Sequence, residues 1–178
     1  MASPHSSSST QALDTSNSTN VIDSLELRSA LGRYATGVTV ITTLDSNGQA
    51  QGLTVNSFSA LSLDPALIVW SLRLESKLLE VFDQSQFYTV NVLSDQQQVV
   101  SQAFASSKGL KFAAAVHQIT EQGQVLIEGA ITQFECQALS YQTAGDHRLY
   151  IAKVLKVTEM PGMPLVFYKG QYTQLSTV

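Results

Sequence analysis

Cysteine, basic charge and long apolar runs are all scarce in this chain of 178 residues. Its single cysteine, Cys136, cannot form an internal disulfide or a thiolate-rich metal site. Ten Lys and Arg against fourteen Asp and Glu give a formal net charge of −4, without any basic block. Binding to nucleic acids or to anionic membrane surfaces requires clustered Lys and Arg, so the charge pattern argues against both partners. No apolar run approaches the roughly 18 residues of a membrane span, so we expect a soluble, cytoplasmic protein.

The motifs of several enzyme classes are missing as well. There is no Gly-rich phosphate loop of the Rossmann or Walker type. The three histidines, His5, His117 and His147, lack metal-ligand spacing, and no serine lies in a nucleophile-elbow motif. Hydrolysis and metal catalysis are therefore poorly supported, and we expect no metal site.

The composition changes sharply after the first twenty residues. Residues 1–20 contain seven Ser and three Thr, and the first Lys or Arg is Arg28. This differs from a secretory signal, which starts with positive charge, and from an Arg-rich transit peptide. We expect a disordered polar tail over 1–20 and one domain over 21–178. With 44% hydrophobic residues, a domain of this size can bury a packed core.

The remaining sequence is typical of a β protein. β-branched residues dominate 37–44, and the turn residues of 45–48 separate this strand from a second one over 49–57. Further strands are predicted over 66–72, 87–93, 124–141, 148–159 and 165–168, and short helices over 22–31, 76–82 and 94–104. Asp23 or Ser24 could cap the first helix and Gly32 could end it, and a capping box over 94–97 would open the third. Many short strands without alternating helices favour an antiparallel barrel.

Two polar segments stand out within this pattern. Residues 52–65 place a run of hydroxyl and amide side chains between apolar strand residues. Such a run is typical of a strand end, and it would also suit the hydrogen-bonding edge of a planar ligand. The second segment, Gly145-Asp146-His147, is typical of a turn when taken alone.

Taken together, 34–42, 52–59, Asp64-Pro65 and 145–147 resemble the flavin reductase family with the flavin-binding split-barrel fold. The resemblance covers residues 27–172, with one departure, Ala66 where the family usually has a second proline. It implies a mainly β fold, a six-stranded antiparallel Greek-key split barrel with a few short flanking helices. It also implies a homodimer with flavin bound near the subunit interface.

The resemblance assigns cofactor-binding positions to this chain. For the flavin ring edge they are Thr54, Val55, Asn56 and Ser57, and for the ribityl phosphate they are Ser71, Arg73, Ser76 and Lys77. Phe104 would close over the flavin, and Gly145, Asp146 and His147 match the nicotinamide-nucleotide motif, near which Thr36 and Gly37 would lie. His147 is the catalytic candidate, in the role of orienting the nicotinamide.

Two interpretations of Ser76 are open. As the first residue of a helix it would direct backbone N–H groups and the positive helix end toward a phosphate, with Lys77 adding charge. It would equally serve as an ordinary N-cap, and one residue can do both. Trp70 is expected in the core rather than against a flavin.

The activity implied by the resemblance is hydride transfer from NADH or NADPH to FMN or FAD, with reduced flavin passed to a partner monooxygenase. Because the cofactors carry this chemistry, the protein needs no acid–base constellation, and none is visible. A non-enzymatic flavin-binding module (a sensor, store or electron carrier) and a structural dimer with an empty pocket are the alternatives. The sequence leaves open FMN against FAD and NADH against NADPH.

Overall fold

The computed structural model describes residues 22–107 and 111–176. Its elements, in chain order, are α1 (Ser24–Leu31), β1 (Thr36–Gly37), β2 (Thr39–Leu44), β3 (Ala50–Val55), β4 (Ser59–Leu63), β5 (Ala66–Arg73), α2 (Leu79–Gln84), β6 (Phe87–Val92), α3 (Gln98–Ala105), the 3₁₀ helix η1 (Lys111–Ala114), β7 (His117–Ile119), β8 (Val125–Ile127), β9 (Thr132–Ala144), β10 (His147–Glu159), β11 (Val166–Tyr168) and β12 (Gln171–Thr173). The tail expected over 1–20 lies outside the described residues. None of the helices within them has the length and apolarity to cross a membrane.

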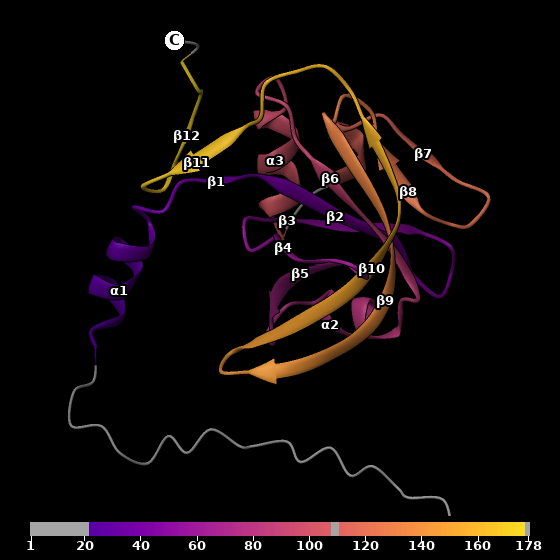
Figure 1. Cartoon of the computed structure of the whole chain (residues 1–178), viewed down its shortest axis with the longest axis horizontal. Coiled ribbons are helices and arrows are strands. Elements are labelled where there is room, and N and C mark those ends of the chain that lie inside the picture. The colour runs from indigo at the N-terminus through magenta and orange to yellow at the C-terminus, as the bar shows by residue number, and fades with distance from the viewer. Residues whose placement is uncertain (1–21, 108–110, 177–178) are drawn as a thin grey trace, which may run out of the picture.

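The main body is one antiparallel sheet of seven strands in the order β3-β2-β6-β9-β10-β5-β4 (Figure 1). β1, β11 and β12 form a small second sheet, and β7 pairs with β8. The mainly β, antiparallel class expected from the sequence is confirmed. Within the described residues the main sheet has seven strands rather than six, because β4 forms an additional edge strand beside β5.

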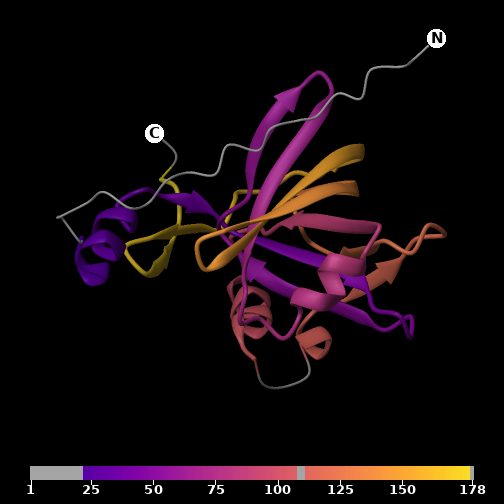
Figure 2. The same ribbon diagram turned by 90° about the horizontal axis from the view of Figure 1, so that it is seen from below.

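The main sheet curls strongly. β9 and β10 form a long curved hairpin with two register shifts along β10, and bulges of this kind increase strand bending (Figure 1). β3 contacts β5 although four strands separate them in the sheet order. The β4–β5 hairpin extends away from the rest of the sheet (Figure 2). The curl therefore brings the end of β3 beside the end of β5.

Two hydrophobic clusters hold the sheet together. In the first, the fully buried Trp70 stacks on Tyr150 at 4.4 Å between ring centroids and meets Phe82 and Tyr88 edge-on. Trp70 thus lies in the core, as expected. The second cluster includes Phe104, which is 1% exposed, and it attaches α3 to the body. Aromatic pairs in these geometries add to the free energy gained from burial alone.

A buried amide lies inside the sheet. Asn91 on β6 is fully buried, and its Nδ2 donates to the Val40 carbonyl and to the Thr42 hydroxyl. Its Oδ1 accepts hydrogen bonds from the Ile127 backbone N–H at 2.9 Å and from Gln133 Nε2 at 3.3 Å. This single side chain therefore ties β2, β6, β9 and β8 to one another.

Local signals placed the first helix well and the other two less well. α1 begins at its predicted cap, since Asp23 Oδ1 accepts from the Leu25 N–H at 3.1 Å, and Gly32 ends the helix. The prediction of a helix over 76–82 was wrong in its bounds, because a turn in which Leu79 N donates to the Ser76 carbonyl precedes α2. The third helix begins at Gln98, four residues later than predicted.

Long strands were also misjudged in places. The predicted strand over 124–141 is divided into β8 and β9, because Gly129 adopts φ +82° and turns the chain between them. The prediction missed β4, whose residues were assigned to the polar segment 52–65. The capping box at Ser94 exists only as a turn, in which Gln97 Oε1 accepts from the Ser94 N–H at 3.0 Å before α3 starts.

Candidate functional site

Two adjoining hollows contain most of the residues that the sequence singled out. The first, which we call the His147 cleft, has a volume of about 1100 Å³ and lies between α1, β1, residues 56–59 and the start of β10. The second, which we call the Arg73 cavity, has a volume of about 460 Å³ and lies between β3, the β5–α2 loop, the end of α3 and η1. The chain passes from one to the other at the end of β3, since Thr54 lines the cavity and Asn56 lines the cleft.

Pairing between β5 and β10 joins the two hollows. His147, which lines the cleft, is the cross-strand partner of Arg73, which lines the cavity. The Leu74 N–H also donates to the Asp146 carbonyl at 3.0 Å, which anchors the turn before β10 to the end of β5. His147 and Arg73 are 74 positions apart in the sequence, so only the sheet register brings them together.

His147 owes its position to a tight hairpin turn. Gly145 adopts φ +59° at the first of two turn residues between β9 and β10, where a type II′ hairpin turn favours glycine. The following Asp146 holds the ring, with Oδ1 at 2.7 Å from His147 Nδ1, and this hydrogen bond lowers the pKa of Asp146. Because an ionised carboxylate only accepts, Nδ1 carries the hydrogen and Nε2 remains for a ligand.

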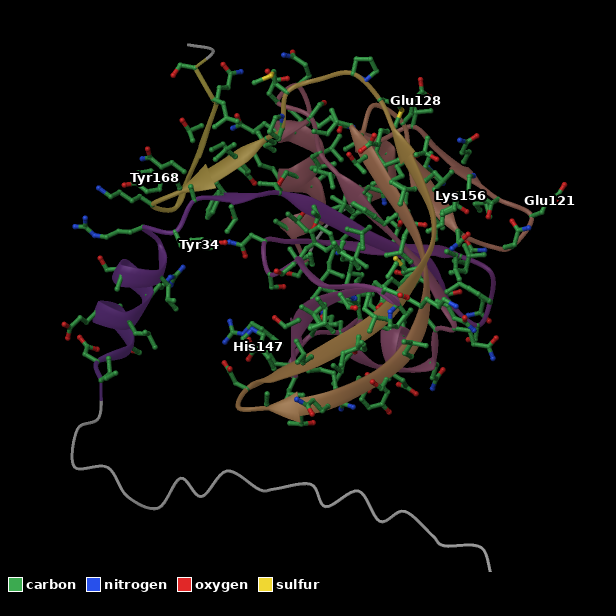
Figure 3. All side chains as sticks on the ribbon, viewed as in Figure 1. Tyr34, Glu121, Glu128, His147, Lys156 and Tyr168 are labelled. Atoms are coloured by element: carbon green, nitrogen blue, oxygen red, sulfur yellow. The ribbon has the colours of Figure 1, made fainter. Side chains whose placement is uncertain are left out.

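The cleft opens in front of this ring. Figure 3 shows His147 at the start of β10 and Tyr34 on the opposite side of the opening. Thr36 and Gly37 of β1 line the same cleft. The Thr36 hydroxyl is buried and has no hydrogen-bond partner among the described residues, which is costly unless a ligand or water supplies one.

The edge strand β3 presents backbone groups to the cavity. It has β2 on one side only, so every second residue directs its N–H and C=O away from the sheet. The Gly52 carbonyl is one of these, because it accepts from Lys111 Nζ at 2.9 Å. By alternation the backbone groups of Thr54 point the same way, toward the Arg73 cavity.

Two of the hydroxyls expected at a flavin edge are used inside the protein. Thr54 Oγ1 donates to the Ser101 carbonyl at 2.7 Å. Ser57 Oγ accepts from the Ser71 N–H at 3.0 Å and donates to the Ser71 carbonyl at 3.1 Å. These bonds fasten the end of β3 to α3 and to β5. The exposed amide of Asn56 and the backbone remain as the polar groups of 54–57 that a ligand can use.

The Arg73 cavity is rich in positive charge. Arg73, Lys77 and Lys111 all line it, together with Ser76 and Glu75, the one acidic residue among the described lining, which pairs with Arg73 at 3.2 Å. Ser76 does not begin α2; its Oγ accepts from the Leu78 N–H at 3.2 Å within the preceding turn. The N-terminus of α2 therefore lies at Leu79, three residues after the position expected from the sequence. The positive potential in the cavity comes from the three cationic side chains instead.

Phe104 forms part of the cavity wall. It is 1% exposed, and its ring packs edge-on against Phe112 at 4.9 Å and lies over Gly52. A side chain this deeply packed is a fixed floor rather than a lid. Lys111, which lines the same cavity, and Phe112, which packs behind Phe104, were not singled out from the sequence, since no local motif marks them.

The structure thus divides the predicted positions into three groups. The His147 cleft contains Thr36, Gly37, Asn56, Ser57 and His147. The Arg73 cavity contains Thr54, Arg73, Ser76, Lys77 and Phe104. Val55, Ser71, Gly145 and Asp146 line neither hollow and support the residues that do.

Cys136 is a buried titratable group that lines neither hollow. Burial raises the pKa of the Cys136 thiol to about 12, so the thiol stays protonated at neutral pH. Within the described residues, no group of three or more His, Cys, Asp or Glu side chains is arranged to hold a metal ion. What the site offers is a cationic cavity, an edge of backbone donors and a neighbouring open cleft. This arrangement suits the class of protein that binds an anionic, planar ligand beside a second one.

Comparison with known proteins supports this class. A family model described as flavin reductase like domain matches residues 31–176. The FMN reductase (NADH) SmoA of Agrobacterium fabrum is 36% identical over 154 residues, covering 86% of this chain and 87% of that protein. The flavin-dependent monooxygenase reductase subunit HsaB of Mycobacterium tuberculosis is 36% identical over 155 residues, covering 85% and 82%.

A solved structure is similar over the same region. The Streptomyces globisporus NADH:FAD oxidoreductase SgcE6, in complex with NAD and FAD fragments, has a TM-score of 0.82 and 28% identity, covering 86% of this chain and 93% of that one. The chain therefore belongs to the flavin reductase family, as its sequence motifs had indicated.

Proposed function

We propose that this chain is an NAD(P)H-dependent flavin reductase that supplies reduced flavin to a partner monooxygenase. The observation that carries the proposal is the register pairing of His147 with Arg73, which sets an open cleft beside a cationic cavity. Family membership and the names of relatives such as SmoA and HsaB support the same activity.

The residues present fit a flavin nucleotide in the Arg73 cavity. Arg73, Lys77 and Lys111 suit its phosphate, and the outward backbone groups of Thr54 suit the hydrogen-bonding edge of the ring. Phe104 supplies an apolar wall. These residues would hold the flavin, and the two cofactors would supply the hydride-transfer chemistry themselves.

The protein's own part is to position both cofactors. Asn56 and Ser57 continue the β3 edge from the cavity into the cleft, where Thr36 and Gly37 border the nicotinamide position. His147, oriented by Asp146, orients the nicotinamide through Nε2 and moves no proton. Correct placement of two reactants alone lowers a barrier by several kcal/mol, roughly 7–11 at best.

We further propose the architecture and setting that the family implies. Strands β2, β3, β5, β6, β9 and β10 form the six-stranded split barrel, with β4 as an extension; the contact between β3 and β5 supports this. A homodimer is supported by the exposed apolar side chains of Leu25 and Leu31 on α1. The cytoplasm is the proposed location, because it supplies reduced nicotinamide.

The direct test is anaerobic bleaching of added flavin by the purified protein. With NADH or NADPH present, catalytic amounts of protein are expected to abolish the visible absorbance of FMN or FAD. Running both flavins with both nicotinamides identifies the preferred pair. A protein that binds flavin but leaves its absorbance unchanged would be a binding module instead. A protein that binds no flavin would be neither a flavin reductase nor a flavin-binding module.

His147→Ala is expected to lower kcat/KM for the nicotinamide roughly 10- to 100-fold, about 1.4–2.7 kcal/mol of transition-state stabilisation. The Kd for flavin should stay within about twofold, because His147 lines the cleft rather than the cavity. Steady-state kinetics and flavin titration measure the two quantities. His117→Asn is the matched control, since that histidine lies on β7 outside both hollows. Equal loss of flavin affinity would contradict the division of roles.

A further inference from the structure

Lys111 is a cation of the Arg73 cavity that no sequence motif indicated. It begins η1, across the cavity from the β5–α2 loop, and it is half-buried. Its Nζ donates to the Gly52 carbonyl at 2.9 Å. This bond holds the ammonium group at the free edge of β3, where the backbone groups of Gly52 point away from β2.

The charge of Lys111 has no counterion among the residues that the structure describes. None of the ion pairs within 22–107 and 111–176 includes it, whereas Arg73 is paired with Glu75. Burial lowers the pKa of Lys111, which reflects the loss of water around its ammonium group. A partly buried cation without a partner is costly, and a bound anion would remove that cost.

The three cationic side chains differ in exposure, in ion pairing and in which hollows they line. Lys77 is exposed and also lines a separate hollow of about 610 Å³ beside the 45–47 turn. Arg73 is exposed and shares its charge with Glu75. Lys111 is partly removed from water and is fixed by a backbone acceptor, with two of its three N–H groups left for a ligand.

We propose that Lys111 is an anion-binding residue of the Arg73 cavity, holding negative charge on the flavin nucleotide. This deepens the proposed function and rests on it. Two parts of a flavin nucleotide carry such charge, the phosphate group and the ring once it is reduced. A compact ammonium group recognises both by the same charge-assisted hydrogen bonding.

The test compares Lys111→Met with Lys111→Arg and uses binding rather than turnover as its readout. Titration with oxidised FMN, oxidised riboflavin and the dithionite-reduced forms of both gives four dissociation constants for each variant. Lys111→Met is expected to weaken at least one anionic form roughly tenfold, because hydrogen bonds to charged groups are the strong ones. Lys111→Arg, which keeps the charge, should stay within about threefold of the wild type. Lys153→Met, at an exposed position of β10, is the matched control and should change nothing.

The pattern of losses identifies the source of the charge. Weaker binding of both FMN forms with unchanged riboflavin assigns the phosphate, and inorganic phosphate should then compete with FMN less well in Lys111→Met than in the wild type. Weaker binding of the two reduced forms alone assigns the reduced ring. Either pattern supports the proposal.

Other outcomes overturn it. An equal loss for all four ligands, oxidised riboflavin included, would mean that Lys111 only holds the cavity wall in place. No loss for any ligand, or a loss that Lys111→Arg fails to restore, would also reject the role of its charge. If the wild-type protein binds no flavin, the proposed function and this inference fall together. If it binds flavin and Lys111→Met binds equally well, this inference alone falls.

Discussion

Asn91→Ala is expected to lower the free energy of unfolding by about 3 kcal/mol, the largest stability effect anticipated for a polar residue here. The substitution leaves the buried Ile127 N–H without the Oδ1 acceptor that it now has at 2.9 Å. It also removes the bonds from Nδ2 to Val40 and Thr42 and opens a small void among fully buried neighbours. β2, β6, β8 and β9 would lose the hydrogen bonds that now connect them through the Asn91 side chain.

Thermal unfolding measures this effect. For a chain of this size, about 3 kcal/mol corresponds to a Tm lower by roughly 6–12 °C. Asn47→Ala, in the exposed 45–48 turn, is the matched control and should change stability by no more than about 0.5 kcal/mol. A Tm for Asn91→Ala equal to that of the control would show that the network contributes nothing to stability.

Gly52→Val is expected to disturb both stability and flavin binding. A Cβ at this position would lie 2.9 Å from Phe104 Cε1 and 3.0 Å from the Ile41 carbonyl oxygen, closer than packed atoms allow. Because Phe104 is buried and Ile41 O belongs to the sheet, neither can move cheaply. We expect a loss of about 2–3 kcal/mol in the free energy of unfolding, as for other overpacked cores.

The displaced Phe104 would then enter the Arg73 cavity and weaken flavin binding by at least tenfold. Denaturant unfolding and flavin titration follow the two effects separately, and Gly52→Ala should show a smaller version of each. Gly37→Ala serves as the control for stability alone, because a Cβ there meets no atom within 4 Å. Unchanged flavin affinity in a folded Gly52→Val protein would contradict the placement of Phe104 at the ligand.

The sequence predicted those parts of the fold that depend on local signals. The cap at Asp23, the β-branched residues of β2 and the turn at 45–48 each determine the conformation of a few neighbouring residues. Most strands were therefore placed to within a few residues. The turn at Gly145 was also correctly expected, since its positive φ is a property of the tripeptide itself.

Features that depend on distant parts of the chain could not be derived in this way. Nothing in the sequence near β4 shows that it pairs with β5, and the start of α2 depends on how the preceding turn folds onto β5. The proximity of His147 and Arg73 comes from strand register, and that of Lys111 and Gly52 from the packing of η1 against β3. Family motifs indicated His147 and Arg73 as site residues, whereas only the structure reveals the contact between Lys111 and Gly52.

α1 lies away from the main sheet (Figure 1) and buries none of its eight residues, and Leu25, Leu27 and Leu31 are all exposed. So short a helix unwinds readily in water unless another surface covers it. Its amide protons should therefore exchange with deuterium within seconds at high dilution, and far more slowly at high concentration if the proposed homodimer covers the helix. Exchange rates at Leu27 and Leu31 would thus give a dissociation constant for the assembly, measured within a single segment of the chain.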